Sequence, residues 1–575
     1  MKKTDLWLAP TILGAGALLA VATVAPALAS HGGSPSPELN VVGQLSTAGL
    51  GIPGGDNVTD VWALGNYAYL GTFDEGVCSL DFTGIHIVDI ANPANPAKVG
   101  FIPAKPGTRN NDVKVAHIET SYFSGDILVA SNEACGSPFL PRLHANGAGA
   151  IPGQGGLSIW DVSNPEKPKQ LRQNFFKFGV HNTFIWQQDD SAYMLVVDDE
   201  NVQDLHIVDI SKPQDPREIA VTGKNDWPDD IAAEFGETAG VFLHDIWVQE
   251  NGGNVIAYLA YWDAGLVMLD ITNPHDPVFL GDSSYGVPDP LSGEFPSGDG
   301  HVAVPNAGGT RVLFGDEDFA AGALNTFTFD GIGYPVSEGG FTPPTYSLPG
   351  GTFGGPVHWT GSHGCTTADF DRIAGPGEVA LIQRGVCFFS TKAANAQALG
   401  YAGFIVANDA ARGDALITMS SGTADVITIP GYFVGNSTGE IMKAGEGNLM
   451  AASGIFDGYG YLRLLDVEDP ANITEVDQFA TEGVLANPPI PGDRTMHNVV
   501  VDGGDNAYIS WYAEGMRVVS FASDTLTETA HFVDIDEDGN GRSNFWGVYL
   551  HDHPNGNSYI LGSDRGTGLW IFEKP

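Results

Sequence analysis

One short segment recurs along this chain, and its recurrence restricts the possible folds more than any other feature. Each copy is a run of apolar, mostly β-branched residues that ends in Asp, with Pro four residues after the Asp. The clear copies are Gly84–Pro93, Gly156–Pro165, Leu205–Pro213, Gly265–Pro274 and Tyr461–Pro470. Apolar runs of this length between Gly and Pro are typical of buried strands, and the Asp and Pro predict a turn after each one. The chain is therefore expected to repeat one strand-based unit.

Each unit is expected to contain four strands and to span about 50 to 60 residues. Two strands precede the recurrent segment, and a fourth follows its proline turn, as in Ala97–Ile102. Weaker copies at Gly515–Phe521 and Gly568–Phe572 bring the five clear copies to seven. Four-stranded units at this period are typical of a β-propeller. The predicted fold class is all-β, a seven-bladed β-propeller.

The last unit ends at Pro575 without a fourth strand. The stretch Leu39–Leu45 could supply that strand from the N-terminal end, which would close the ring and protect both sheet edges. The recurrent segments resemble the LVIVD repeat of secreted bacterial proteins, which is built as a propeller. This resemblance covers most of residues 39–340 and 455–575. A histidine at the start of the first strand is usual in such repeats, where it often only bonds neighbouring backbone.

The N-terminus reads as a secretory signal over residues 1–29. Lys2 and Lys3 form a basic start, Thr11–Ala25 is apolar, and Ala27–Ala29 has the small residues of a cleavage site. The apolar run is short for a membrane span, and no later segment approaches the required length. We expect an exported protein, periplasmic or extracellular, with no membrane span after cleavage. An uncleaved anchor is the alternative.

Net charge indicates which classes of partner the protein can bind, and the cysteines indicate which disulfides an exported chain would form. The formal charge is −44, from 26 Lys and Arg against 70 Asp and Glu, which argues against nucleic acid and anionic membranes as partners. Four cysteines in an exported chain suggest two disulfides, and three pairings are possible. Because Cys365 and Cys387 lie together outside the repeats, and Cys78 and Cys135 lie in equivalent loops of the first two units, we expect 365–387 and 78–135.

Residues 336–455 lack the repeat and begin with the Gly- and Pro-rich stretch Gly339–Pro344, which predicts a domain boundary. We expect blades 1–5 and the closing strand in residues 39–335, an inserted α/β domain in 336–455, and the remainder of the propeller in 456–575. The pattern Gly364–Cys365, Arg384–Phe388 and Lys392–Gln397 resembles the protease-associated (PA) domain. That resemblance implies a lid or recognition module without catalytic residues of its own.

Four histidines open the first strands of four consecutive units: His181, His244, His301 and His497. In an antiparallel pair, the start of the first strand lies beside the end of the second, and acid-rich loops follow the second strands. Ring closure would therefore bring imidazoles and carboxylates to one rim. Units one and two have Thr59 and Asn111 at the aligned positions, so the histidines would gather on one side of the ring.

Imidazole and carboxylate ligands together suit a divalent transition metal such as Mn, Zn, Fe or Co. Four histidines and several acids could hold two ions that clamp and activate a water. The order Glu200, His244, His301, Glu317, His497 also resembles the ligand pattern of propeller-type phosphotriesterases, the secreted haloalkylphosphorus hydrolases. The resemblance implies that Glu200 and the three histidines hold the ions. Glu317 would be a ligand or bridge, and His181 an extra or outer ligand, with both carboxylates serving catalysis.

A calcium loop is expected from Asp534, Asp536, Asp538 and Asn540, with Gly539 at the sixth position. The bidentate Glu that usually ends such a loop is missing, because Phe545 stands at the twelfth position. An acidic turn without an ion is the alternative.

Two functions follow from these features. The first is a secreted metal-dependent hydrolase that attacks a small phosphoester, such as a phosphotriester, with metal-activated water. The second is a non-catalytic, calcium-stabilised extracellular scaffold in which propeller and PA domain bind partners. Tightly held transition metal, lost on substitution of His244 or His301, would distinguish the first from the second.

Overall fold

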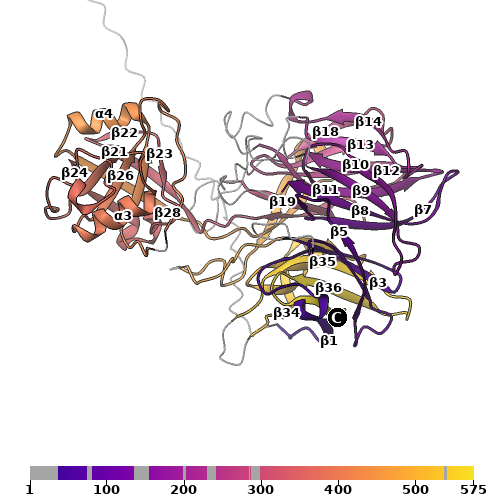
Figure 1. The fold of residues 1–575 in the computed structure, drawn as a ribbon. Helices are drawn as coiled ribbons and strands as arrows, with labels where there is room; N and C mark the ends of the chain where they lie inside the picture. The colour runs from indigo at the N-terminus through magenta and orange to yellow at the C-terminus, as the bar shows by residue number, and fades with distance from the viewer. Residues whose placement is uncertain are drawn as a thin grey trace, which may run out of the picture.

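The computed structural model describes residues 36–73, 81–134, 155–198, 203–228, 241–283, 285, 298–423, 425–487, 489–535 and 541–575. Within these residues, seven antiparallel sheets form a ring and an eighth, mixed sheet forms a separate body beside it (Figure 1). The seven-bladed propeller with an inserted domain is therefore confirmed. The predicted signal segment 1–29 lies outside the described residues.

The first four blades follow one another in the chain. Blade 1 contains β2 (Val58–Leu64), β3 (Tyr67–Thr72), β4 (Gly84–Asp89) and β5 (Ala97–Pro103), and blade 2 contains β7 (Val113–Glu119), β8 (Ser124–Ala134), β9 (Gly156–Asp161) and β10 (Lys169–Phe175), with β6 (Thr108–Arg109) beside β8. Blade 3 contains β11 (Val180–Gln188), β12 (Ser191–Asp198), β13 (Leu205–Asp209) and β14 (Arg217–Thr222). Blade 4 contains β15 (Leu243–Asn251), β16 (Asn254–Tyr261), β17 (Gly265–Asp270) and β18 (Val278–Asp282). The predicted recurrent segments form the third strand of each blade.

The last three blades complete the ring. Blade 5 contains β19 (Gly300–Pro305), β20 (Arg311–Asp316), β29 (Leu462–Asp466) and β30 (Thr474–Phe479); blade 6 contains β31 (Val499–Val501), β32 (Asn506–Trp511), β33 (Gly515–Ser520) and β34 (Thr527–Phe532); blade 7 contains β35 (Phe545–Asp552), β36 (Ser558–Asp564), β37 (Gly568–Glu573) and β1 (Val41–Leu45). Strand β1 pairs antiparallel with β37, so the predicted closure by the N-terminal strand is confirmed.

The hydrophobic core is divided among the contacts between neighbouring blades. Within the described residues, each adjacent pair shares one buried apolar cluster, for example Leu195 and Val197 of blade 3 with Leu243 and Leu259 of blade 4. The cluster between blades 7 and 1 closes the circle. Each fully buried aliphatic side chain stabilises the fold by about 1.5–3 kcal/mol, so no blade can be removed without exposing two such surfaces.

The inserted domain interrupts blade 5 between β20 and β29. Its strands are β21 (Gly322–Phe329), β22 (Ile332–Gly333), β23 (Val336–Glu338), β24 (Thr352–Trp359), β25 (Val379–Gln383), β26 (Gly403–Ala407), β27 (Gly431–Val434) and β28 (Leu449–Phe456), and its α-helices are α3 (Phe389–Ala398) and α4 (Asn436–Ala444). The insertion begins earlier than the predicted residue 336. Strand β21, which the repeat pattern assigned to the propeller, pairs with β28 instead of with a blade.

Short helices occupy several connections: α1 (Thr47–Leu50) and the 3-10 helices η1 (Lys224–Asp226), η2 (Thr345–Ser347), η3 (Pro349–Gly351), η4 (Thr367–Asp369), η5 (Pro470–Asn472) and η6 (Ala522–Asp524). Among the described residues, no helix has the length and apolar character that a membrane span requires. A disulfide joins Cys365 to Cys387 in the inserted domain, which confirms that predicted pair. The predicted Cys78–Cys135 pair lies outside the described residues.

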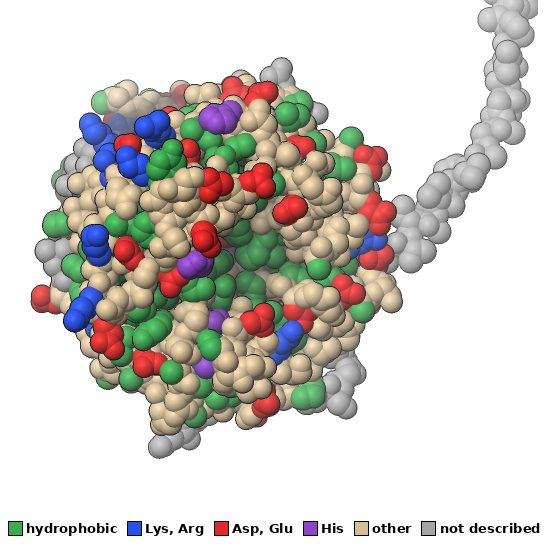
Figure 2. All heavy atoms as spheres, turned by 90° about the vertical axis from the view of Figure 1, so that its right-hand side faces the viewer, with side chains coloured by type: hydrophobic (Ala, Val, Ile, Leu, Met, Phe, Trp, Pro, Cys, Tyr) green, Lys and Arg blue, Asp and Glu red, His purple; other side chains and the backbone are tan. Residues whose placement is uncertain are grey.

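The two faces of the propeller differ in what they carry. The insertion leaves blade 5 after Asp316, at the end of a second strand, and therefore on the rim where the first strands begin. Figure 2 shows the face turned away from the inserted domain, where apolar side chains line a central hollow and acidic side chains surround it.

Candidate metal centre at the propeller axis

A bulge recurs where the innermost strand of a blade begins. The register between first and second strands shifts at Val180/Thr183, Leu243/Asp245 and Gly300/Val302, so that His181, His244 and His301 stand at the irregularity. Bulges re-aim side chains that would otherwise follow the strand alternation. His497 lies two residues before β31 and donates its backbone N–H to Ser510 O. The local irregularity thus places the first three imidazoles at the rim, and the segment just before β31 places the fourth.

The four imidazoles form a continuous arc across blades 3 to 6, which we call the histidine arc. Ring centroids are 4.4 Å apart for His181 and His244, 4.3 Å for His244 and His301, and 4.2 Å for His301 and His497. The Trp546 ring of blade 7 extends the arc, 4.2 Å from His497. The structure therefore brings together four histidines that are far apart in sequence.

Glu317 places a carboxylate against the middle of this arc. Its Oε2 lies 3.7 Å from Nε2 of His301, and its Oε1 lies 3.7 Å from Nε2 of His497. Ligand atoms of His244, His301 and Glu317 lie within 4.8 Å of one another, and all three side chains are buried. In tetrahedral metal sites with bonds of about 2.0–2.2 Å, ligand atoms lie about 3.3–3.6 Å apart. A closure of up to about 1.5 Å would therefore fit one ion.

Tyr512 was not predicted from the sequence, yet its hydroxyl donates a hydrogen bond of 2.5 Å to Oε1 of Glu317. The side chain is 1% exposed and packs edge-on against His497 and Trp546. Its backbone φ of 24° is rare for a residue with a side chain, and two hydrogen bonds with Phe545 hold it there. No repeat signal marked it, because it lies in the loop after β32 and only its neighbour Glu514 fitted the acidic pattern.

His181 has different partners from the other members of the arc. Its Nδ1 pairs with Glu133 Oε1 at 2.5 Å, and Arg109 holds the other carboxylate oxygen at 2.8 Å. Its Nε2 faces the amide of Asn111 at 3.4 Å. Burial opposes ionisation of Glu133, but Arg109 and His181 prevail and lower its pKa to about 2. His181 is therefore the member least available to an ion.

Burial also sets the protonation of the central groups. It lowers the pKa of His301 and His497 well below the ordinary value, and neighbouring imidazoles add to this effect at His301. Burial raises the pKa of Glu317 to about 8, against the opposing hydrogen bond from Tyr512. At neutral pH the two imidazoles are neutral, which metal ligation requires, and the carboxyl carries a proton that an ion would displace.

Several carboxylates of the acid-rich loops that follow the second strands are engaged in other contacts. Asp198 pairs with His206, Asp316 with Arg463 and Glu514 with Arg494. Glu200, which was predicted to be a metal ligand, lies outside the described residues. Two carboxylates therefore contact the histidine arc: Glu317 lies against His301 and His497, and Glu133 pairs with His181.

Only the first member of the predicted calcium loop lies among the described residues. Asp534 accepts a hydrogen bond from Arg542 at 2.8 Å, while Asp536, Asp538 and Asn540 lie outside them. The calcium loop stays a prediction.

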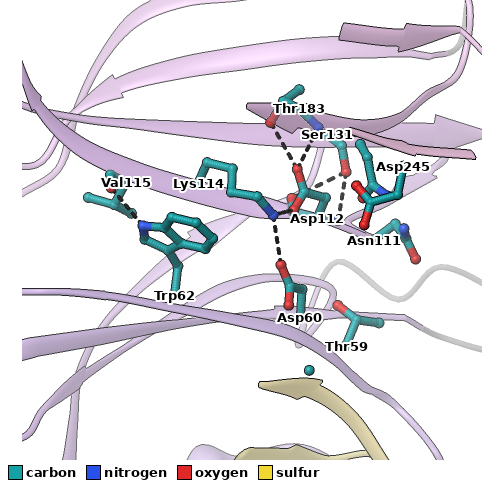
Figure 3. A network of polar contacts seen from close by, with 12 residues as sticks. Thr59, Asp60, Trp62, Asn111, Asp112, Lys114, Val115, Ser131, Thr183 and Asp245 are labelled. Atoms are coloured by element: carbon teal, nitrogen blue, oxygen red, sulfur yellow. Dashed lines mark hydrogen bonds and ion pairs between the residues drawn. The ribbon is translucent and has the colours of Figure 1, made fainter. Parts of the chain in front are cut away.

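A second polar cluster lies beside the arc, on blades 1 to 4 (Figure 3). The Lys114 ammonium donates to Asp60 at 3.0 Å and to Asp112, and it lies over the Trp62 ring. Asp112 also accepts from the backbone N–H and hydroxyl of Thr183. Burial raises the pKa of Asp60 to about 7, although Lys114 opposes it. The cluster thus buries its charges with an internal counter-ion.

Comparison with known proteins supports the domain assignment. The PA domain model matches residues 353–442, and the LVIVD repeat model matches residues 54–102, 192–221 and 244–283. The chain therefore contains a PA domain and LVIVD repeats, as predicted.

Among curated proteins, the chain is 36% identical over 118 residues to vacuolar-sorting receptor 1 of Pisum sativum, covering 18% of each protein. It is 34% identical over 126 residues to vacuolar-sorting receptor 2 of Arabidopsis thaliana, covering 19% of each. The chain thus spans about a fifth of the length of these relatives.

Similar solved structures include the β-propeller domain of Cps50 (Swd1) from Myceliophteria thermophila, with 10% identity, a TM-score of 0.40, and coverage of 91% of this chain and 98% of that one. The zinc aminopeptidase BSAP from Bacillus subtilis has 20% identity and a TM-score of 0.20, over 27% of this chain and 35% of that one.

Proposed function

We propose that the protein is an exported metal-dependent hydrolase of phosphoesters, with one divalent transition-metal ion held by His244, His301, His497 and Glu317. The observation that carries the proposal is the approach of the Glu317 carboxylate to two buried imidazole Nε2 atoms at 3.7 Å each. A second ion would need Glu200 as well. When bound, such an ion supplies Lewis-acid polarisation of the phosphoryl group and lowers the pKa of a water.

The side chains of the centre suit that chemistry. His301 and His497 are neutral at neutral pH because burial lowers their pKa values. The Glu317 carboxyl, with a pKa raised to about 8, can give or take a proton at Oε2 near neutral pH. Tyr512 holds the other oxygen and fixes the direction in which Oε2 points.

Two arginines lie beside the arc, Arg109 paired with Glu133 and Arg565 next to Trp546, and they would favour a substrate with phosphoryl oxygens. The Arg109 guanidinium lies 4.0 Å from the Phe73 ring centre, and that of Arg565 lies 5.0 Å from the Trp546 ring centre. The positive charge of Arg565 lowers the pKa values of both Glu317 and His497, so its field reaches the centre. Guanidinium groups bind phosphate oxygens in a bidentate manner. In a chain with a net charge of −44, this local positive charge favours a phosphoryl group.

Metal analysis and one assay test the proposal together. Protein stripped of metal and reloaded with Mn²⁺, Zn²⁺ or Co²⁺ should retain about one ion per chain through gel filtration and hydrolyse a chromogenic phosphotriester. The variants His301→Ala and Glu317→Gln should lose both properties. The control His206→Ala, which removes a buried histidine paired with Asp198 outside the arc, should keep them. Protein that retains no ion under any of these conditions would contradict the proposal.

The second candidate function is partner binding by an extracellular or lumenal scaffold. It is supported by the PA domain and by the similarity to proteins named as sorting receptors. In that case deletion of residues 322–456 should abolish binding of a partner, while the metal variants should leave it unchanged. The predicted calcium ion at Asp534 would then only stabilise a loop, and its removal would lower the melting temperature without affecting hydrolysis.

A further inference from the structure

A small, partly enclosed space lies next to the histidine arc, and most of its lining is polar. The lining residues are Asp60, Asn111, His181, Asn182, His301, His497, Asn498 and Trp546, drawn from blades 1, 2, 3, 5, 6 and 7. Its volume of about 10 Å³ is close to the about 10–15 Å³ that one water molecule needs. The space therefore fits one occupant of that size.

Four buried polar atoms on these residues have no hydrogen-bond partner in the described part of the chain: Oδ1 of Asn111, Oδ1 of Asn498, Nδ1 of His301 and Nδ1 of His497. Buried polar groups are nearly always paired, with protein or with ordered water. The imidazoles of His301 and His497 do face the backbone carbonyls of the next blades, but not with good hydrogen-bond geometry. Four polar atoms without a hydrogen-bond partner thus belong to residues that line the same space.

The chemistry of these atoms defines the occupant. The Asn111 amide has its Nδ2 end toward His181, 3.4 Å from Nε2 and 3.5 Å from the carbonyl oxygen. Its Oδ1 points away from His181 and is an acceptor without a donor, and Oδ1 of Asn498 likewise has no donor. A neutral imidazole carries one N–H. If that proton is on Nδ1 in both histidines, the space is surrounded by two donors and two acceptors, which matches the two lone pairs and two protons of water.

We propose that this cavity binds one water molecule that fixes the tautomer of two histidines. The water accepts hydrogen bonds from Nδ1–H of His301 and His497 and donates to Oδ1 of Asn111 and Asn498. Both Nε2 atoms are then unprotonated and face Glu317 at 3.7 Å. Such outer hydrogen bonds set the orientation and basicity of metal-ligating histidines. The link to metal binding rests on the proposed function, whereas the water site itself does not.

A cation is the competing occupant, because Asp60 lines the cavity and three carboxylates stand nearby (Figure 3). Those carboxylates have partners: Asp60 and Asp112 accept from Lys114, and Asp245 accepts from the N–H of Ile246. A cation would also repel Nδ1–H and move the proton to Nε2. The two occupants therefore predict opposite tautomers, which makes them distinguishable.

A crystal structure of the full chain without added metal, at a resolution that orders water, is the first test. We expect one density peak at about 2.7–3.2 Å from all four atoms. A peak bound only to oxygens at about 2.3–2.6 Å would identify a cation. That result, or an empty cavity, would overturn the proposal.

Nitrogen-15 NMR of histidine-labelled, metal-free protein is the second test. His301 and His497 should be almost entirely in the Nδ1–H form at neutral pH. The variants Asn111→Leu and Asn498→Leu should shift them toward a mixture. Asn57→Leu is the matched control, since Asn57 is a similarly buried amide (8% exposed) outside the cavity. Unchanged tautomers in both cavity variants, or an Nε2–H form in the wild type, would contradict the proposal.

If the leucine variants do not fold, the histidine tautomers of the wild-type protein and its crystal structure still test whether the cavity holds a water. Because both tests use metal-free protein, a failure of metal binding would leave them valid. Absence of a water, with metal binding intact, would refute this inference alone.

Discussion

Replacing Tyr512 with Phe removes one hydroxyl from the candidate centre and leaves its ring packing in place. The lost hydrogen bond to Glu317 measures 2.5 Å and is fully buried. A hydrogen bond to a charged group contributes about 1.5–3 kcal/mol. Loss of a partner of a ligating carboxylate weakens metal binding about 10–100-fold, which corresponds to about 1.4–2.7 kcal/mol. Because the two magnitudes agree, we expect a 10–100-fold increase in the Kd for the ion.

The pH dependence of binding gives a second readout for the same variant. Metal binding displaces the proton of Glu317, so affinity should rise with pH up to its pKa of about 8. The Tyr512 hydrogen bond lowers that pKa, against the larger effect of burial. Its removal should therefore shift the rise to higher pH.

Chelator competition with Zn²⁺ and Mn²⁺ between about pH 6 and 9 would measure both effects. The control is Tyr261→Phe, which removes a buried hydroxyl that donates to Asp204 at 2.7 Å outside the centre. Equal loss of affinity in both variants would indicate general destabilisation. Wild-type affinity in a folded Tyr512→Phe protein would refute the positioning role of this hydroxyl.

Three further predictions concern crosslinking, protonation and ring closure. Replacing Cys365 and Cys387 with Ser removes a crosslink between residues 22 apart. Because the crosslink restricts the unfolded chain, its loss should lower the unfolding free energy of the inserted domain by about 3 kcal/mol. Urea titrations would measure this change, and an unchanged free energy would contradict the prediction. The pKa values of His301 and His497 are lowered from 6.5, so the stability they contribute is complete above pH 6.5 and is lost as pH falls through the depressed values. Calorimetry should show a fall in Tm below pH 6.5 that is smaller in the His301→Ala variant, which lacks one of the two groups, and equal falls would refute this cause. Deleting residues 36–45 removes β1 and exposes the edge of β37, so the variant should melt earlier and associate in gel filtration; a monomer of unchanged Tm would contradict the closing role.

The repeat was predictable from sequence because its signal is local. Each third strand combines an apolar run, Asp and Pro within one segment, as in Gly84–Pro93, and strand pairing followed from that order. The boundary of the insertion was less predictable. Strand β21 has the composition of a blade strand, and only its pairing with β28 assigns it to the inserted domain.

For the candidate centre, the histidines were predictable and their partners were not. His181, His244, His301 and His497 share a position in the repeat, so ring closure was enough to bring them together. Which carboxylates reach them depends on competition for partners. Asp316 lies beside Glu317 in sequence, yet Arg463 and Tyr285 hold it away from the arc.

The sequence by itself determined the architecture: a chain of like units, each with its own turn signals, a strand that completes the last unit, and one inserted domain that interrupts a repeat. Periodicity and turn chemistry are properties of neighbouring residues, so they survive in the linear order. The tertiary structure alone decided the chemistry at the axis. Tyr512 contacts Glu317 across 195 residues, and Asn111 and Asn498 share a cavity with His301. Such contacts depend on how the blades close around one axis, which no local pattern encodes.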